Sequence, residues 1–196
     1  MRSAREDIFE RLERARPPRP GPPPAMTPPP AAIDPIACLR DRLTEAGGTL
    51  QIASRNDWAN QIAWPVERSE LVHVYSSRPE VPHQGVGESA RTNHELAPLD
   101  LCILSGDFAV VENGAVWQTP TTARERAAAL LATHLILVVD LDEIVPTLHQ
   151  AYARIPSDSP SFGWFLCGPS KTADIEQSLV LGAHGPCTMS LVLLEG

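Results

Sequence analysis

Long apolar segments are absent from this chain of 196 residues. No stretch approaches the roughly 20 consecutive apolar residues that a membrane-spanning helix requires. Residues 1–16 are charged throughout and lack the apolar core of a secretory signal peptide. The sequence therefore predicts a cytoplasmic protein without a membrane span.

Basic residues are also scarce. The chain has 16 lysine and arginine residues against 24 aspartate and glutamate residues, and its net charge is −8. Proteins that bind nucleic acids without sequence preference do so through a positive surface field. We therefore expect no nucleic-acid partner.

The cysteines are few and scattered. Cys38, Cys102, Cys167 and Cys187 form no C-x-x-C pair, whereas iron–sulfur clusters generally need clustered cysteines. Cys102 and Cys167 lie in apolar runs, which predicts small buried side chains. Cys187 follows a turn and is expected to be more exposed. We expect neither a cluster nor another metal site in this chain.

Several common catalytic motifs are missing as well. There is no G-x-G-x-x-G after a strand and no G-x-x-x-x-G-K-[ST], so dinucleotide and P-loop sites have no support. A G-x-S-x-G nucleophile turn is also absent. His94-Glu95 does not complete H-E-x-x-H, because position 98 is Pro98. These absences leave open whether the chain is an enzyme.

The first 35 residues differ in composition from the rest. Residues 1–15 place Ile8, Phe9 and Leu12 at helical spacing, which predicts a short amphipathic helix. One alternative is that this helix is a frayed chain terminus. The other is that it docks on the folded domain or on a partner protein. Residues 16–35 are rich in proline and predict an extended linker.

Residues 36–196 predict a single α/β domain. Their apolar runs are short, continuous and separated by helical segments, which is typical of a mostly parallel sheet with helices on both faces. Predicted strands span 49–53, 71–75, 99–104, 135–139, 162–167 and 189–194, and predicted helices span 36–46, 56–63, 122–132 and 141–154. A β-hairpin that turns at Asn113-Gly114 adds an antiparallel insertion.

A polar turn near the C-terminus predicts a ligand site. Gly168-Pro169-Ser170 ends an apolar run, and Ser170 or Thr172 can cap a following helix that ends at Gly182. The free backbone N–H groups of such a helix start can bind an anion or a carboxylate, and Lys171 adds positive charge. The alternative is that these residues only cap the helix and bind no ligand.

Glu112 is the candidate catalytic residue. It precedes the Asn113-Gly114 turn, between two apolar strands where an unpaired carboxylate would be costly. If it is buried, it needs a partner such as a backbone N–H group or Lys171, and burial suits a carboxyl group to general acid or base catalysis. The alternative is a plain hairpin whose Glu112 points to solvent.

Two acidic residues and a histidine extend the candidate site. Asp174 and Glu176 fall in the first turn of the predicted helix, where the helix dipole favours negative charge. His184 lies in a turn, where it either binds a ligand or serves as a structural turn residue. The candidate ligand-binding residues are Gly114, Ser170, Lys171, Thr172, Asp174, Glu176 and His184.

Four segments, in this order along the chain, resemble the lactate utilization protein C family and its LUD domain. They read TNHELAPLD at 92–100, FAVVENGAVW at 108–117, HLILVVD at 134–140 and GPSKTADIEQSLVLGAHGP at 168–186. The last is similar to a family signature in which G-P-S-x-T-A-D-I-E precedes a G-x-H-G-P turn. The resemblance covers roughly residues 36–196.

The resemblance implies a fold similar to the sugar-phosphate isomerase and CoA-transferase superfold. It implies an accessory subunit of L-lactate utilization, the system that oxidises lactate to pyruvate. Iron–sulfur partner proteins are expected to carry the clusters, and no cofactor is expected in this chain. A small carboxylate or a phosphorylated compound is the expected ligand.

Two other functions stay open. The chain could be an enzyme that acts on a hydroxy acid, a sugar phosphate or an acyl thioester, if Glu112 and the predicted helix start converge on one site. It could instead be a regulatory domain that senses a carboxylate and signals to a partner through its N-terminal helix and linker.

Overall fold

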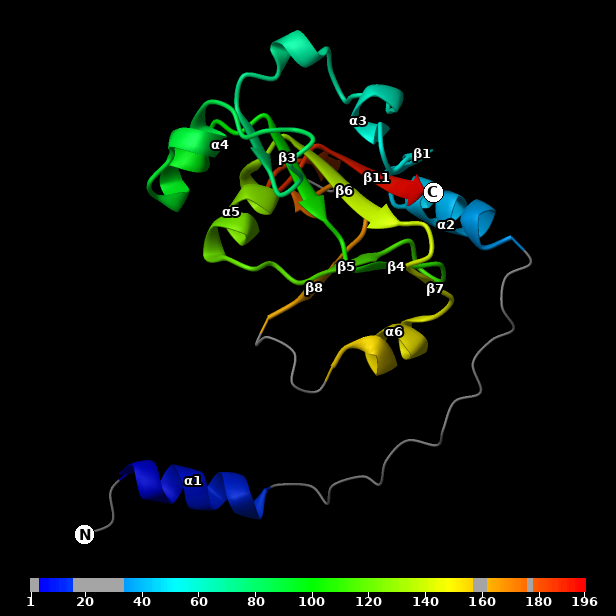
Figure 1. Cartoon of the computed structure of the whole chain (residues 1–196). Coiled ribbons are helices and arrows are strands. Elements are labelled where there is room, and N and C mark those ends of the chain that lie inside the picture. The colour runs from blue at the N-terminus through cyan, green and yellow to red at the C-terminus, as the bar shows by residue number, and fades with distance from the viewer. Residues whose placement is uncertain (1–3, 16–33, 157–161, 176–177) are drawn as a thin grey trace.

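A parallel sheet forms the centre of the computed structural model, which describes residues 4–15, 34–156, 162–175 and 178–196. Five strands lie in the order β1-β11-β6-β3-β2, and every neighbouring pair is parallel (Figure 1). The strands are Thr49–Ser54 (β1), Val74–Ser76 (β2), Leu101–Ser105 (β3), His134–Asp140 (β6) and Thr188–Glu195 (β11). This arrangement confirms the predicted α/β fold with a mostly parallel sheet.

Both faces of the parallel sheet are buried, because its strands are apolar on both sides. Leu135 and Leu137 of β6 face one hydrophobic core. Ile136 and Val138 face a second core on the opposite side, as the two-residue period of a strand requires. Helices and loops must therefore cover both faces.

Helices α2 and α5 cover the first face, and the short helix α3 covers the second. Leu39 and Leu43 of α2 belong to the first core, and Trp58 of α3 belongs to the second. The helices are α2 (Pro35–Glu45), α3 (Trp58–Gln61), η1 (Arg68–Glu70), α4 (Val86–Ser89), η2 (Asn93–Leu96) and α5 (Ala123–Leu131). The prediction of helices on both faces is confirmed.

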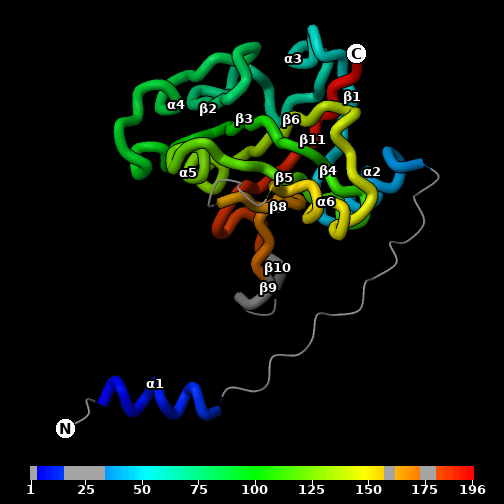
Figure 2. The backbone as a smooth tube through the Cα atoms, turned by 60° about the horizontal axis from the view of Figure 1, so that its bottom comes forward, coloured from blue at the N-terminus to red at the C-terminus, as the bar shows by residue number. Residues whose placement is uncertain are grey.

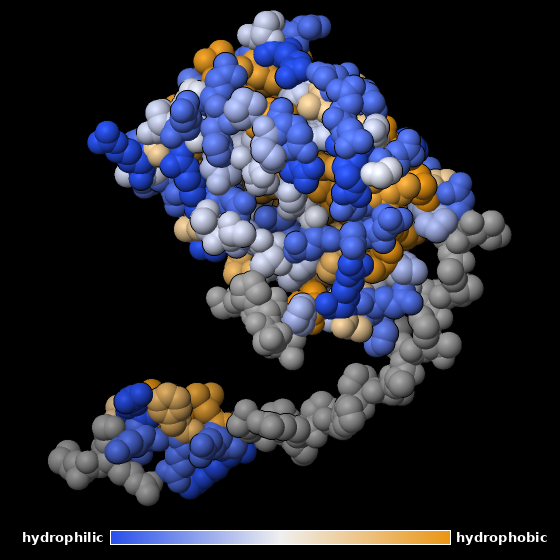
Figure 3. Space-filling model, viewed as in Figure 1, coloured by the Kyte–Doolittle hydropathy of each residue, from blue (hydrophilic) through white to orange (hydrophobic). Residues whose placement is uncertain are grey.

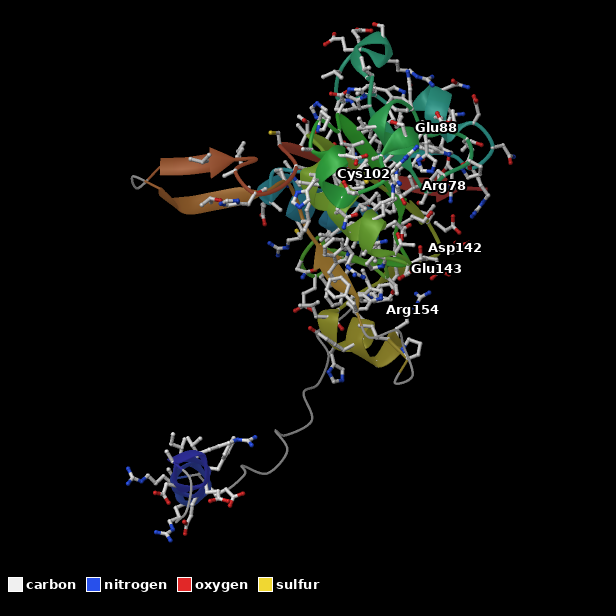
Figure 4. The ribbon with its side chains drawn as sticks, turned by 90° about the vertical axis from the view of Figure 1, so that its left-hand side faces the viewer. Arg78, Glu88, Cys102, Asp142, Glu143 and Arg154 are labelled. Atoms are coloured by element: carbon white, nitrogen blue, oxygen red, sulfur yellow. The ribbon has the colours of Figure 1, made fainter. Side chains whose placement is uncertain are left out.

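A second sheet lies between the parallel sheet and helix α6 (Figure 1). Its order is β7-β4-β5-β8, with bounds Ile144–Val145 (β7), Phe108–Val110 (β4), Val116–Gln118 (β5) and Trp164–Leu166 (β8). The antiparallel β4–β5 pair is the predicted hairpin. The helix predicted at 141–154 is shorter, because β7 occupies its start and α6 spans only Leu148–Arg154. Arg154 pairs with Glu143 beside β7 (Figure 4).

The helix predicted between Ser170 and Gly182 is wrong. The chain forms an antiparallel hairpin instead, made of Lys171–Ile175 (β9) and Ser178–Leu181 (β10). Thr172 pairs with Val180 in its register, and such β-branched residues favour extended backbone. Figure 2 shows this hairpin projecting from the body.

The N-terminal helix α1 spans Ala4–Arg14 and buries none of its residues. The predicted linker at 16–35 falls outside the described residues except for Asp34 and Pro35. These two residues start α2, because the Asp34 side chain accepts the Ala37 N–H at 3.0 Å and proline suits the first helical position. No described helix has the length and apolar character that a membrane crossing demands.

Candidate functional site

The β4–β5 turn places Gly114 against helix α2. Gly114 is buried and has a φ of +73°. A Cβ atom at this position would lie 2.9 Å from the backbone nitrogen of Leu43. Its N–H donates to the Val110 carbonyl at 3.0 Å. The geometry therefore gives Gly114 a packing role, and ligand binding by Gly114 stays a prediction.

Glu112 is exposed and has a backbone partner. Its Oε2 accepts the N–H of Leu148 at 2.7 Å, and Leu148 is the first residue of α6. A carboxylate at a helix start satisfies an otherwise unpaired N–H and complements the helix dipole. The Glu112 side chain is exposed to solvent, which is one of the two alternatives that the sequence left open. The argument for a general acid or base role required a buried Glu112, and that burial is absent.

Ser170 closes the base of the β9–β10 hairpin. Its N–H donates to the Pro186 carbonyl at 2.9 Å, and its carbonyl accepts the Gly182 N–H at 3.0 Å. Because no helix begins here, the row of free N–H groups predicted for an anion is not present. The predicted anion site therefore loses the helix terminus on which it rested, and ligand binding by Ser170 stays a prediction.

Lys171 and Thr172 lie in the first part of β9. Lys171 is exposed and lies against Gly47, just beyond the end of α2, where its positive charge complements the helix dipole. Thr172 is half-buried in its pair with Val180. The side chain of Asp174 and the whole of Glu176 lie outside the described residues, so their predicted roles stay predictions.

His184 is exposed in the turn that follows β10. It lines a shallow depression together with Leu130 and Leu131. The structure places His184 in a turn, and the choice between ligand binding and a structural role stays a prediction. Within the described part of the chain, no hydrogen bond or ion pair joins Glu112 to Ser170, Lys171 or His184.

The cysteines differ in their surroundings. Cys102 is buried, as predicted, and burial raises the pKa of its thiol well above the ordinary value (Figure 4). Cys187 is exposed, also as predicted. The prediction for Cys167 is wrong: it follows the end of β8 and is exposed, and its thiol donates to the Asn113 carbonyl at 3.2 Å. Partial burial raises the pKa of Cys167, and the positive charge of Lys171 opposes this.

A polar pocket that the sequence reasoning missed lies near the carboxyl ends of the parallel strands. Residues 56–60 follow β1, Glu80 follows β2, and together with Arg68 they line a cavity of about 130 Å³. The polar run Arg55-Asn56-Asp57, directly after a predicted strand, was the available signal. A larger cavity of about 280 Å³ beside the start of α2 is mainly apolar. The described residues hold no group of three or more metal-ligating side chains.

The chain is similar to proteins of lactate utilization. It is 28% identical over 144 residues to lactate utilization protein C from Halalkalibacterium halodurans, which covers 69% of this chain and 63% of that protein. It is 31% identical over 141 residues to lactate utilization protein C from an Exiguobacterium species, which covers 68% and 56%. The chain thus spans about three fifths of the length of these relatives.

A solved structure and a family profile agree with this similarity. The crystal structure of a DUF162 family protein from Deinococcus radiodurans has a TM-score of 0.55 and 18% identity, and covers 82% of this chain and 96% of that one. That likeness shows the fold. The LUD domain profile matches residues 51–194, which is most of the chain. The chain therefore belongs to the LUD domain family.

Proposed function

We propose that this chain is an accessory subunit of cytoplasmic L-lactate utilization, in which lactate is oxidised to pyruvate. The observation that carries the proposal is the LUD domain match over residues 51–194, together with relatives that are named lactate utilization protein C. The oxidation removes two electrons from lactate. In this proposal iron–sulfur partner proteins accept those electrons, and this chain holds no cluster of its own.

The distribution of the cysteines supports a subunit without a cluster. Cys38 lies in α2, Cys102 in β3, Cys167 after β8 and Cys187 before β11. Cys102 is enclosed by the first core, and its raised pKa disfavours the thiolate that binds iron. The other three belong to separate elements, whereas cluster motifs usually draw their ligands from one short loop.

The first test is growth on L-lactate. Deleting the reading frame should abolish growth on L-lactate and leave growth on pyruvate intact, because pyruvate lies beyond the proposed step. The full chain supplied from a plasmid should restore growth. Unchanged growth of the deletion strain on L-lactate would refute the role in this pathway.

The second test asks whether the partner proteins, and not this chain, hold the iron–sulfur clusters. The chain purified without oxygen should be colourless and contain no iron, and a tagged chain should recover iron–sulfur proteins from lactate-grown cells. Iron at one or more atoms per chain would refute the absence of a cluster. Failure to recover any iron–sulfur protein would count against an accessory role.

A further inference from the structure

The loop after β2 folds back onto the outer edge of the parallel sheet. β2 is the last strand in the sheet order, and only β3 pairs with it in the described sheet. Its other edge is covered by residues 83–90, which include helix α4 and which we call the latch segment. Val74 and Gln84 exchange two backbone hydrogen bonds of 2.9 Å across this contact. Figure 2 shows α4 beside β2.

Two glycines let the latch segment pack directly against the chain at β2. Gly85 has a φ of +58°, and a Cβ atom at this position would clash with His73 Nδ1. A Cβ atom at Gly87 would clash with the Val74 carbonyl oxygen. Because neither glycine carries a side chain, backbone N–H groups can reach across the contact.

Two histidines hold the segment to β2 from opposite sides. The Val86 N–H donates to His73 Nδ1 at 3.3 Å, so a ring directly before β2 holds the segment. The Ser76 N–H donates to His83 Nδ1 at 3.2 Å, so a ring in the segment holds β2. In both bonds the imidazole is the acceptor, which requires a neutral ring with its proton on Nε2. The two bonds therefore depend on the same protonation state.

Protonation removes the acceptor from both bonds. An imidazolium ring carries a proton on each nitrogen, so its Nδ1 has no lone pair left for a backbone N–H. Each hydrogen bond is then replaced by two N–H groups that face one another. Histidine is the side chain that ordinarily takes up a proton between about pH 8 and about pH 5. Acid thus acts on both attachments of the segment together.

His73 has a carboxylate beside it. Asp100 precedes β3, and its Oδ2 accepts the backbone N–H groups of His73 at 2.8 Å and of Val72 at 3.0 Å. Glu88 of α4 is exposed (Figure 4), and within the described chain no hydrogen bond or ion pair joins it to His73. A protonated His73 ring would be attracted by Asp100, which offers it an alternative to the Val86 N–H.

His83 lies against Tyr75 of β2, with 4.8 Å between the ring centres. Burial raises the pKa of Tyr75, so this ring stays uncharged in acid. Arg124 of α5 lies 5.8 Å from the Tyr75 ring centre, and it donates to the Gly87 and Ala90 carbonyls of the segment. Further charged groups at this end of the sheet are Arg78, Glu80 and Glu125. Carboxyl groups ordinarily titrate at about pH 4 and guanidinium groups above about pH 12, which leaves the imidazoles as the groups that respond to mild acid.

We propose that His73 and His83 form a pH-sensitive latch, which holds the latch segment on β2 while both rings are neutral and releases it in acid. Release uncovers the outer edge of β2, including the N–H groups of Val74 and Ser76. Unpaired strand edges are templates for pairing with another chain. Acid therefore changes the surface that this edge of the sheet offers to a partner.

Hydrogen exchange of the full chain tests the latch. Protection factors, which correct for the effect of pH on intrinsic exchange, should fall at least about fivefold for the amides of Ser76, Gln84 and Val86 between about pH 7.5 and about pH 5.5. The amide of Val192 in the buried strand β11 is the internal reference and should change less.

A pair of substitutions separates the rings from other effects of acid. Asparagine places a carbonyl oxygen where histidine has Nδ1, and it does not titrate. The double variant His73→Asn with His83→Asn should therefore keep the segment protected at about pH 5.5. His149→Asn is the matched control, because His149 is exposed on α6 and its ring has no hydrogen bond to a described residue. This control should lose protection as the wild type does.

Nitrogen NMR of the wild-type imidazoles gives a readout that needs no variant. Both rings should carry their proton on Nε2 at about pH 7.5. A proton on Nδ1 of either ring at that pH would overturn the latch, and so would segment protection factors that are equal at the two pH values. Equal loss of protection in the wild type and in the folded double variant would overturn it as well.

Discussion

His134 illustrates how one partly buried ring couples stability to pH. It begins β6, and its Nδ1 lies 2.8 Å from the Thr188 hydroxyl. Partial burial lowers its pKa from the ordinary 6.5, although the Asp100 carboxylate opposes the change. The unfolded chain therefore takes up a proton more readily than the folded chain. The contribution of neutral His134 is complete above about pH 6.5 and is lost as the pH falls through the lowered value.

We predict that the stability advantage of the wild type over His134→Gln shrinks as the pH is lowered from about 7.5 to about 5.5. Glutamine keeps a polar group beside Thr188 but does not titrate. Urea unfolding of both proteins at several pH values measures the difference directly. An advantage that stays constant or grows on acidification would show that folding does not lower the pKa of His134.

Glu112 shows what local sequence can say about a single residue. Its position between apolar strands predicted a partner for a buried carboxylate, and a backbone N–H was one of the two partners considered; Glu112 has such a partner although it is exposed. The sequence could not identify that partner, because Leu148 lies 36 residues further along the chain. The sequence could not predict the exposure of Glu112 either, because that exposure depends on how α6 packs beside the β4–β5 turn.

At the scale of elements, the contact between the β4–β5 turn and α2 depends on the absence of a side chain. Gly114→Ala should lower the free energy of unfolding by about 1–3 kcal/mol, through its positive φ and through the clash with α2. Denaturant unfolding measures the change. Gly196 is a useful control, because its φ is +93° and a Cβ there meets nothing within 4 Å. If Gly196→Ala costs as much as Gly114→Ala, the contact with α2 is unimportant.

The β9–β10 hairpin shows why one predicted helix failed. Capping residues and first-turn acids fit a helix start at Ser170, and those signals are local. The hairpin is fixed by more distant bonds, from Ser170 to Pro186 and from Gly182 back to Ser170. Pairing of Thr172 with Val180 then favours the extended form. Because the candidate anion site was inferred from the helix, the error in one element removed the argument for the site as well.

At the scale of the whole molecule, helix α1 is expected to contribute nothing to stability. Its apolar residues Ile8, Phe9 and Leu12 are 57%, 54% and 61% exposed, and they form the apolar patch on α1 in Figure 3. A chain that begins at Asp34 should therefore melt at the same temperature as the full chain. Calorimetry of the two proteins tests this. A melting temperature lowered by several degrees would show that the removed segment packs on the body.

The sequence predicted the strands of the parallel sheet better than their arrangement. Segments rich in apolar residues identified all five, and the signal was strongest for β3, β6 and β11, whose strands are buried over most of their length. Their order depends on pairing between distant segments, which no local pattern encodes. The polar pocket was missed for the same reason, since Trp58, Arg68 and Glu80 come together only after the segments fold.

The position of β11 in the sheet delays the pairing of β1 during synthesis. β11 lies between β1 and β6, and it is the sole strand with which β1 pairs in the described sheet. Thr49 and Ser190, which meet across this pair, are 141 residues apart. At roughly 5–20 residues per second, a ribosome needs roughly 7–28 s to cover that distance. During this interval the apolar residues of β1 have been synthesised without their partner, so β1 precedes the other described strands in the sequence and is among the last of them to be paired.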